Sequence, residues 1–336
     1  MKLAAGSLTL AGLLVLLLCP PSLAGDFAVL NSTSVRDQAG RRIRANQPYS
    51  RIISLYGAHT ENLYALGAGS RVVGVSDGST YPPRAREKES FSYQQGVERF
   101  LAADPDLVLI RPMIDRGHGR LVTRLEEAGV TVVSLQPRQP EEIKTYWRIL
   151  GALTGRQKRA GQMIAKFRES MRELRTLGRG VSDKKTVYFE AIHDQMKTFA
   201  PESIAMHVLE SAGGINAAAD ARSVRGTNIA AYGKERILAR GEEIDVYLAQ
   251  KGPMNQPTLK MIRREPGFSV IRAIRRGRIH IVEEEIVSRP TPRLLLGAYR
   301  IGRILYPDTY TPKVGEKVSR IIRTLYSTQE AGYEPE

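Results

Sequence analysis

Short apolar segments alternate with segments of helical spacing along most of this chain, and this alternation constrains its fold more than any other feature. The first series predicts strands at 51–55, 71–75, 107–110 and 130–135 and helices at 60–67, 97–103 and 121–128. Strands that alternate with helices pair in parallel and are covered by helices on both faces. The first series therefore predicts one α/β lobe.

The alternation starts again in the second half, after a long uninterrupted segment. The second series predicts strands at 186–189, 245–249 and 278–282 and helices at 204–212, 235–239, 257–264 and 292–305. The segment between the two series, 156–177, has no proline and one glycine, and its apolar residues recur at helical spacing. A helix of about 22 residues is about 33 Å long. The pattern predicts two α/β lobes joined by one rigid helix.

The same pattern divides the chain into parts. We expect a signal peptide at 1–24, an N-terminal arm at 25–47, an N-terminal α/β lobe at 48–150, a linker helix at 151–180, a C-terminal α/β lobe at 181–310, and a C-terminal helix and tail at 311–336. The arm is largely polar and basic, and we expect a short hairpin there. The expected fold class is thus α/β, with the ligand cleft between the two lobes.

Residues 1–24 have the pattern of a secretory signal peptide. Lys2 precedes an uncharged apolar run at 3–18, two prolines break the run, and residues 22–24 form a small-residue cleavage site. The run is shorter than the roughly 20 residues that span a bilayer, which argues against a membrane anchor. A leucine precedes Cys19, which argues against a lipoprotein. We expect export to the periplasm through a cleaved signal.

The net charge of the chain raises the question of an anionic partner. It is +15 at pH 7, from 50 Lys and Arg against 35 Asp and Glu. Such basicity is typical of nucleic-acid-binding proteins, but an exported protein does not meet chromosomal DNA, so we expect no nucleic-acid partner. The positive charge then reflects an anionic ligand, a partner at the membrane surface, or no specific partner. The single cysteine excludes a disulfide framework and a cysteine-based zinc site.

Two glycine motifs resemble catalytic or nucleotide-binding signatures and fail on context. Residues 74–78 read Gly-Val-Ser-Asp-Gly, but a loop with two prolines follows them, whereas a nucleophile elbow runs into a helix. Residues 67–69 read Gly-Ala-Gly after a helix, with Val72 where a dinucleotide fingerprint needs its third glycine. We therefore expect no catalytic residue, no intrinsic cofactor and no enzyme activity.

Three of the five histidines follow predicted strands. These are His59, His118 and His193. In open parallel sheets, ligands collect beyond the carboxyl ends of the strands, so the three side chains could line one cleft. Neutral imidazole is a common metal ligand. The alternative is that they are histidines of surface loops, which we favour for His118 because glycines flank it.

Several segments, in their order and spacing, resemble a known family. They are 51–55, 60–61, 65–67, 72–75, 81–83 and 97–108 in the first half, and 199–203, 210–216 and 288–293 in the second. Together they resemble the periplasmic binding proteins of ABC importers for iron chelates (siderophores or haem) and cobalamin. The resemblance implies two Rossmann-like lobes bridged by a rigid helix, a metal chelate bound between them, a monomeric protein, and delivery of the chelate to a permease at the inner membrane.

The resemblance also implies which loops meet the ligand. These positions are Tyr56, Gly57, His59, Gly78, Tyr81, Tyr93 and Arg111 in the first lobe, and Glu190, His193, Arg225, Asn228, Lys251 and Arg289 in the second. Their arginines could pair bidentately with carboxylates, so the set favours an anionic chelate. The single tryptophan, Trp147, lies outside these loops, which counts against cobalamin. Haem stays open, because Tyr56, His59 and His193 could act as axial ligands.

Two glutamates are implied as docking points for the permease. Glu98 and Glu235 stand at corresponding helix starts of the two lobes, and an arginine follows each. The alternative for each is an ordinary solvated helix charge.

Two other functions stay open from the sequence. A bare transition-metal ion could be captured by His59, His193 and Glu190, with His118 as a further ligand. An exported tetrapyrrole or metal chelatase could use His193 and Glu190 as ligands or as acid–base groups.

Overall fold

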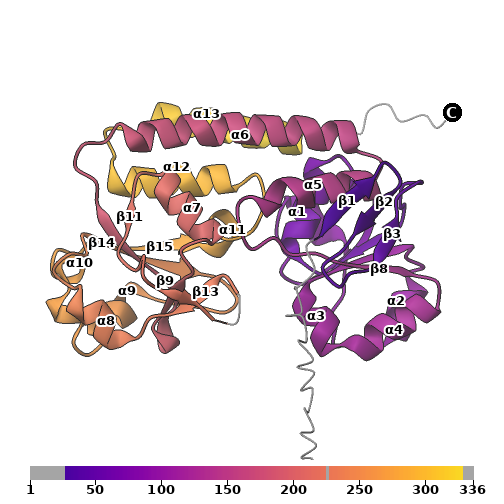
Figure 1. Cartoon of the computed structure of the whole chain (residues 1–336), viewed down its shortest axis with the longest axis horizontal. Coiled ribbons are helices and arrows are strands. Elements are labelled where there is room, and N and C mark those ends of the chain that lie inside the picture. The colour runs from indigo at the N-terminus through magenta and orange to yellow at the C-terminus, as the bar shows by residue number, and fades with distance from the viewer. Residues whose placement is uncertain (1–26, 225–226, 328–336) are drawn as a thin grey trace, which may run out of the picture.

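The computed structural model describes residues 27–224 and 227–327. The predicted signal peptide at 1–24 lies outside these described residues. Two lobes stand side by side below α6 (Gln157–Arg179) and α13 (Pro312–Tyr326), which run across one side of the molecule (Figure 1). Within the part of the chain that is described, no helix is long and apolar enough to cross a membrane.

The N-terminal lobe is built on a parallel five-stranded sheet in the order β6-β5-β4-β7-β8. Its strands are β4 (Ile52–Ser54), β5 (Val72–Val75), β6 (Glu89–Ser90), β7 (Leu107–Ile110) and β8 (Thr131–Ser134). Its helices are α1 (Gly57–Ala65), α2 (Val97–Ala102), α3 (Pro112–Gly117), α4 (Gly119–Glu127) and α5 (Glu142–Leu153), with 3₁₀ turns η1 (Gly69–Arg71) and η2 (Pro83–Glu87). The predicted elements are present, and α3, α5 and β6 are additional.

The C-terminal lobe has a seven-stranded sheet in which β12-β13-β10-β9-β14-β15 are neighbours and β11 also pairs with β9. Its strands are β9 (Thr186–Ile192), β10 (Lys197–Phe199), β11 (Ile215–Asn216), β12 (Arg222–Ser223), β13 (Ile229–Ala231), β14 (Val246–Lys251) and β15 (Ile279–Glu283). Its helices are α7 (Ile204–Ser211), α8 (Lys234–Ala239), α9 (Leu259–Arg264), α10 (Arg272–Arg275), α11 (Glu284–Val287) and α12 (Leu294–Leu305), with 3₁₀ turns η3 (His193–Gln195) and η4 (Phe268–Val270).

The expectation of a wholly parallel sheet is wrong for this second lobe. Strands β10, β12 and β13 pair antiparallel, and only β9, β11, β14 and β15 form the parallel part. The cause is local, because β9 turns back into β10 through η3 and Met196, whose φ of 48° lies in the left-handed region. A tight turn can join antiparallel strands, whereas parallel strands need a long crossover.

The polar arm forms a small sheet of its own. Strands β1 (Ala28–Asn31), β2 (Ser34–Arg36) and β3 (Arg42–Arg44) pair antiparallel, one strand more than a hairpin. The Asp37 carboxylate fastens this sheet to the N-terminal lobe, because its Oδ2 accepts from the backbone N–H of Ser134 at 2.9 Å and from the Arg41 guanidinium at 2.9 Å.

Helix α6 buries one apolar stripe, which includes Ala160, Met163, Ile164, Phe167, Met171 and Leu174. The predicted spacing therefore produces a helix at this position. One hydrophobic cluster runs from β4 and α5 through this stripe to α7 and α12. The two lobes thus share core contacts along the helix that joins them.

Polar contacts join the lobes below α6. The Arg293 guanidinium donates to both carboxylate oxygens of Glu61 in α1, at 2.8 and 2.7 Å, and both side chains are buried. The Pro290 carbonyl accepts from Asn62 Nδ2 at 2.9 Å and from Trp147 Nε1 at 3.2 Å. The segment that precedes α12 is therefore fixed to α1 and α5.

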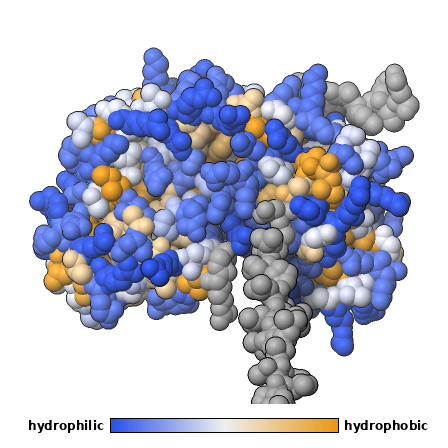
Figure 2. Space-filling view, in the orientation of Figure 1, coloured by the Kyte–Doolittle hydropathy of each residue, from blue (hydrophilic) through white to orange (hydrophobic). Residues whose placement is uncertain are grey.

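The face seen in Figure 2 is mainly hydrophilic, with hydrophobic residues in separate small patches. Exposed arginines and lysines contribute much of this hydrophilic surface, as the composition requires.

Candidate ligand-binding cleft

A cavity of about 390 Å³ lies between the lobes. In the N-terminal lobe it is lined by the segments that directly follow β4, β5, β6, β7 and β8; in the C-terminal lobe it is lined by the ends of β9 and β14 and by the segment after β15. The carboxyl ends of the parallel strands of both sheets therefore face the same space, which is where open α/β sheets bind ligands.

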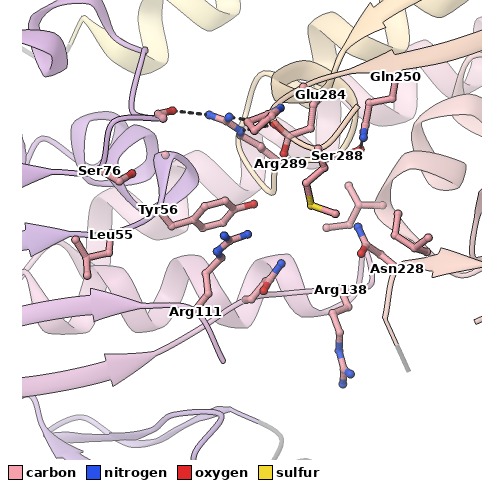
Figure 3. A pocket seen from close by; sticks show the side chains of 18 of the residues that line it. Leu55, Tyr56, Ser76, Arg111, Arg138, Asn228, Gln250, Glu284, Ser288 and Arg289 are labelled. Atoms are coloured by element: carbon pink, nitrogen blue, oxygen red, sulfur yellow. Dashed lines mark hydrogen bonds and ion pairs between the residues drawn. The ribbon is translucent and has the colours of Figure 1, made fainter. Parts of the chain in front are cut away.

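Tyr56 and Arg111 form the N-terminal wall of the cavity. Figure 3 shows both side chains reaching into the cavity from the loops after β4 and β7. The Arg111 guanidinium lies 4.7 Å from the centre of the Tyr56 ring, and its buried Nε has no hydrogen-bond partner among the described residues. Burial and the nearby Glu284 carboxylate raise the pKa of Tyr56 to about 12, so its phenol stays protonated. This wall offers a neutral hydroxyl and a cation to a ligand.

Arg289 forms a bridge across the back of the cavity. Its Nη2 lies 3.0 Å from Glu284 Oε2, and its Nη1 donates to the Gly78 carbonyl of the other lobe at 3.1 Å (Figure 3). Burial alone lowers the pKa of Arg289, but the Glu284 carboxylate raises it above the usual range. A Cβ at Gly57 would lie 2.5 Å from Arg289 Nη1 and 2.8 Å from the Gly78 carbonyl, so the bridge requires a glycine there.

The other predicted cleft residues fall into three groups. Tyr93, Asn228, Gly57 and Gly78 line the cavity together with Tyr56, Arg111 and Arg289. Lys251 is exposed and its neighbours Gln250 and Gly252 line the cavity instead. Arg225 lies outside the described residues.

His59 does not line the cavity, which corrects the prediction that it meets the ligand. It is fully buried in α1, with Nδ1 2.7 Å from the Tyr146 hydroxyl and Nε2 3.2 Å from the Ile110 carbonyl. Burial lowers the pKa of His59 to about 3. Both ring nitrogens are engaged, so this imidazole holds α1 against α5 and β7 and has no free nitrogen for an axial ligand.

Tyr81 is a second correction. It packs on the core instead of the cavity, edge-on to Tyr326 with ring centres 4.9 Å apart. The Arg293 guanidinium lies 4.2 Å from the centre of its ring. The ring therefore covers the buried Glu61–Arg293 pair.

Glu190 in β9 and His193 directly after it are buried and do not line the cavity, although Ala191 and Ile192 between them do. Glu190 Oε2 is 2.8 Å from His193 Nδ1 and accepts from the Tyr247 hydroxyl, while Glu190 Oε1 has no partner in the described part of the chain. The hydrogen bond to Glu190 raises the pKa of His193. The backbone N–H of His193 donates to Asn255 Oδ1 at 3.0 Å, so this pair supports the loop after β14.

Sequence reasoning missed several lining residues. Gln136, Pro137 and Arg138 follow β8, and Pro253 and Met254 follow β14, with Met254 72% exposed. Applying the rule for carboxyl ends to every predicted strand would have found both segments. In Figure 3 Arg138 stands at the margin of the cavity, whereas Tyr56 and Arg111 point toward its centre.

The charges around the cavity are unequal. Arg111, Arg138 and Arg289 carry three positive charges, against Asp77 and Glu284. The charge of Arg289 is offset by its ion pair with Glu284. Arg111 is therefore the cation that points into the cavity and is available to a ligand. The wall favours a ligand with negative charge.

Two α/β lobes on a common helix, with a cationic and aromatic cavity between them, define a two-lobed solute-binding protein. The chain belongs to the periplasmic binding protein family, whose model matches residues 52–285. The predicted class, the substrate-binding component of an ABC importer, is confirmed.

Similar proteins include a lipoprotein and a vitamin-binding protein. The uncharacterised ABC transporter substrate-binding lipoprotein YvrC of Bacillus subtilis is 26% identical over 282 residues, which cover 82% of this chain and 86% of YvrC. The vitamin B12-binding protein of Vibrio cholerae is 26% identical over 251 residues, which cover 74% of this chain and 86% of that protein.

A solved structure shares the fold and part of the sequence. The structure of a possible iron-binding periplasmic solute-binding protein from Staphylococcus epidermidis matches with a TM-score of 0.67 and 26% identity, covering 77% of this chain and all of that one.

Proposed function

We propose that this protein captures a metal chelate with anionic peripheral groups and delivers it to a membrane permease. The observation that carries this proposal is the cavity of about 390 Å³, with Arg111 and Tyr56 aimed into it from one lobe and Asn228 and Gln250 from the other. Its volume lies within the range of about 300–1,000 Å³ that is usual for small-ligand sites. Arginine suits carboxylates because its planar fork donates two parallel hydrogen bonds.

The side chains expected to bind a bare metal ion do not all come together in the structure. His59 is engaged inside the N-terminal lobe, whereas Glu190 and His193 are buried together in the other. Among the described residues, no group of three or more His, Cys, Asp and Glu side chains is placed to hold an ion. The cavity instead offers guanidinium and amide groups, which suit the periphery of a chelate, and tyrosine phenols, which can add an axial ligand to an iron that is already chelated.

The two residues expected to act as acid and base in a chelatase do not line the cavity. Glu190 and His193 do not line the cavity, so a tetrapyrrole bound there does not meet them. We propose a binding protein without catalytic residues and without a resident cofactor, active as a monomer.

Within the class of chelates, the aromatic contacts come from tyrosine and phenylalanine rings and not from tryptophan. Trp147 is fully buried and donates to the Pro290 carbonyl, so the rings that line the cavity are those of Tyr56, Tyr93, Phe91 and Phe199. Relatives are named for vitamin B12 and iron. The single well-placed cation, Arg111, favours an iron chelate that carries carboxylates over the less charged corrinoid.

Export and docking complete the proposal. The leader at 1–24 directs the chain to the periplasm, where cleavage releases it. Glu98 in α2 and Glu235 in α8 are both exposed and stand in the first turns of corresponding helices. Glu98 contacts Arg124 at 3.0 Å, and Glu235 has no side-chain partner among the described residues. We infer that both carboxylates meet cations of the permease.

Native mass spectrometry of protein purified from its own periplasm tests the ligand directly. The expected result is one bound metal chelate per monomer. Calorimetry then compares ferric dicitrate, haemin, cyanocobalamin and free Zn²⁺, with an Arg111→Gln variant as control. A ferric carboxylate chelate should bind and should lose affinity in the variant. Binding of Zn²⁺ alone, or product formation from a metal-free porphyrin, contradicts the proposal.

A further inference from the structure

A second cavity, of about 330 Å³, lies where the start of α5, the middle of α6 and α7 meet, and none of its lining residues lines the cleft. Figure 1 shows α7 in one lobe and α5 in the other, both below α6. Its polar rim consists of Glu141, Lys144, Arg168, Arg172, Arg175 and His207, and its floor of Pro140, Ile143, Phe167 and Met171. We name this second cavity the arginine groove.

Three of the four cations of the arginine groove share one face of α6. Arg168, Arg172 and Arg175 are spaced four and three residues apart on α6, so they follow one another along one side of the helix. Lys144 approaches from α5. Like charges at this spacing repel one another and destabilise a helix. Around the groove these four cations are accompanied by a single acidic side chain, Glu141.

None of these four cations forms an ion pair with a described residue. The acidic residues of α6 are engaged elsewhere, Glu169 with Lys166 at 3.0 Å and Glu173 with Lys317 at 2.7 Å. The carboxylates of this surface thus pair with Lys166 and Lys317 and not with the cations of the arginine groove.

One guanidinium is positioned by a neutral imidazole. Arg175 Nη2 lies 3.1 Å from His207 Nδ1 and 3.5 Å from Ser211 Oγ. Burial and the charge of Arg175 lower the pKa of His207 to about 4, against a smaller opposing effect of Glu141, so the ring is an acceptor at neutral pH. The remaining nitrogens of Arg175 stay available to a ligand.

We propose that the arginine groove binds a phosphate-bearing anion. Phosphate oxygens accept several charge-assisted hydrogen bonds at once, and arginine is the side chain best shaped to give them. The apolar floor of Phe167 and Met171, both buried, allows an organic group to lie beside the phosphate. A bound anion removes the repulsion among the four cations. The source is a soluble phosphate compound or the headgroup of an anionic lipid.

The test measures binding of inorganic pyrophosphate to the full-length protein by calorimetry, at an ionic strength of about 0.15 M to screen diffuse attraction. We expect saturable one-to-one binding. The double variant Arg168→Gln/Arg172→Gln should bind about tenfold more weakly or worse, because it loses two charge-assisted donors. The matched control, Arg148→Gln/Arg179→Gln, removes the same charge from exposed positions of α5 and α6 outside the groove and should bind like the wild type.

Two further readouts locate the site and its source. The ring protons of His207 should shift on addition of pyrophosphate in NMR spectra, and an Arg111→Gln cleft variant should respond in the same way. Vesicles of phosphatidylglycerol in phosphatidylcholine should bind the wild type but not the groove variant if the source is a lipid; if it is soluble, only pyrophosphate should. The proposal is overturned if neither probe binds, or if the control variant loses as much affinity as the groove variant.

Discussion

At the scale of single residues, His59 and His193 illustrate how surroundings decide what an imidazole can do. Both follow strands and both were candidate ligands. His59 is enclosed in α1 between the Tyr146 hydroxyl and the Ile110 carbonyl, and its pKa falls to about 3. His193 is held by the Glu190 carboxylate, which raises its pKa. The first is neutral across the physiological range, and the second is stabilised in its charged form.

These opposite shifts predict opposite effects of pH on stability. Between about pH 6.5 and 3, His59 binds a proton in the unfolded chain but not in the folded one. The free energy of unfolding therefore decreases as the pH drops through this range. The contribution of His193 is present below about pH 6.5 and is lost as the pH rises through its raised pKa. His59→Gln should flatten the acid side of the stability profile, and His193→Gln the neutral to alkaline side. Urea unfolding across pH measures both; equal slopes in wild type and variants contradict the assignment.

Replacing the two central cleft arginines should separate binding from stability. Arg111→Gln should weaken binding of the chelate by on the order of 1.5–3 kcal/mol and leave the fold intact, because the side chain is half-buried, lies over the Tyr56 ring and has no hydrogen-bond partner for its Nε among the described residues. Arg289→Gln should also lower the free energy of unfolding, by about 1–3 kcal/mol, because it leaves Glu284 and the Gly78 carbonyl without their donor. Calorimetry and urea unfolding measure the two effects. An Arg111→Gln variant with wild-type affinity would show that the ligand does not meet this wall.

Residue roles were partly predictable from the sequence. Tyr56 and Arg111 follow predicted strands, and the strand-end rule is enough to place them at the cavity. Asn228 precedes β13, which the sequence did not predict, so only the family resemblance implied its place. The same rule placed His59 there wrongly, because α1 begins at Gly57 and carries the histidine inward. Which face of a helix is buried depends on where its first turn starts, and an error of three residues reverses the answer.

At the scale of elements, α6 combines an apolar stripe toward the core with two very different glycines. Gly161 is exposed, and a Cβ there meets no atom within 4 Å. Gly178 is buried, and a Cβ there would lie 2.6 Å from the backbone nitrogen of Gly213. The last turn of α6 is therefore seated directly on the end of α7.

This pair of glycines gives a matched prediction. Gly161→Ala should stabilise the protein by about 0.5–1 kcal/mol, because alanine loses less backbone entropy in a helix interior. Gly178→Ala should destabilise it by about 1–3 kcal/mol, because the backbone of Ala212 and Gly213, just after α7, must move to admit the methyl group. Urea unfolding of both variants is the measurement. If Gly178→Ala is as stable as Gly161→Ala, the close approach of α6 and α7 is wrong.

The elements that the sequence did not predict share a physical cause. The sequence did not predict α5 because Pro137, Pro140 and Gly151 interrupt the pattern there. Both prolines precede the helix. Gly151 lies inside it and packs on Ala160, where a Cβ at Gly151 would lie 2.8 Å from the alanine Cβ. Strands β10, β12 and β13 are too short to show a period and exist because of long-range pairing. Tertiary contacts, not local preference, define them.

At the scale of the whole molecule, the shared core along α6 predicts small movement on binding. The two lobes are joined by one hydrophobic cluster and by the buried Glu61–Arg293 pair. We expect the X-ray scattering curves of the free and chelate-bound protein to superimpose closely. A large decrease in the radius of gyration on binding would mean that the lobes close about a flexible hinge instead.

The distribution of acidic residues over the molecule leads to the prediction on docking. Glu98 and Glu235 lie on α2 and α8, in the parts of the two lobes farthest from α6 and α13 (Figure 1). On a chain with a net charge of +15, two acidic points at this end can fix the orientation against a cationic permease. Charge complementarity of this kind governs orientation and association rate more than affinity.

The double variant Glu98→Arg/Glu235→Arg should therefore bind the chelate normally in solution and fail to support its uptake through the cognate permease. Each single reversal should give a partial defect that is stronger at low salt, where repulsion is least screened. A control with the same change of charge, Glu169→Arg/Glu316→Arg on the exposed faces of α6 and α13, should transport normally. Uptake of radiolabelled chelate into cells that carry each variant measures the effect. Normal uptake by the first double variant would contradict docking through these carboxylates, whereas a defect in both variants would mean that net charge alone controls the encounter.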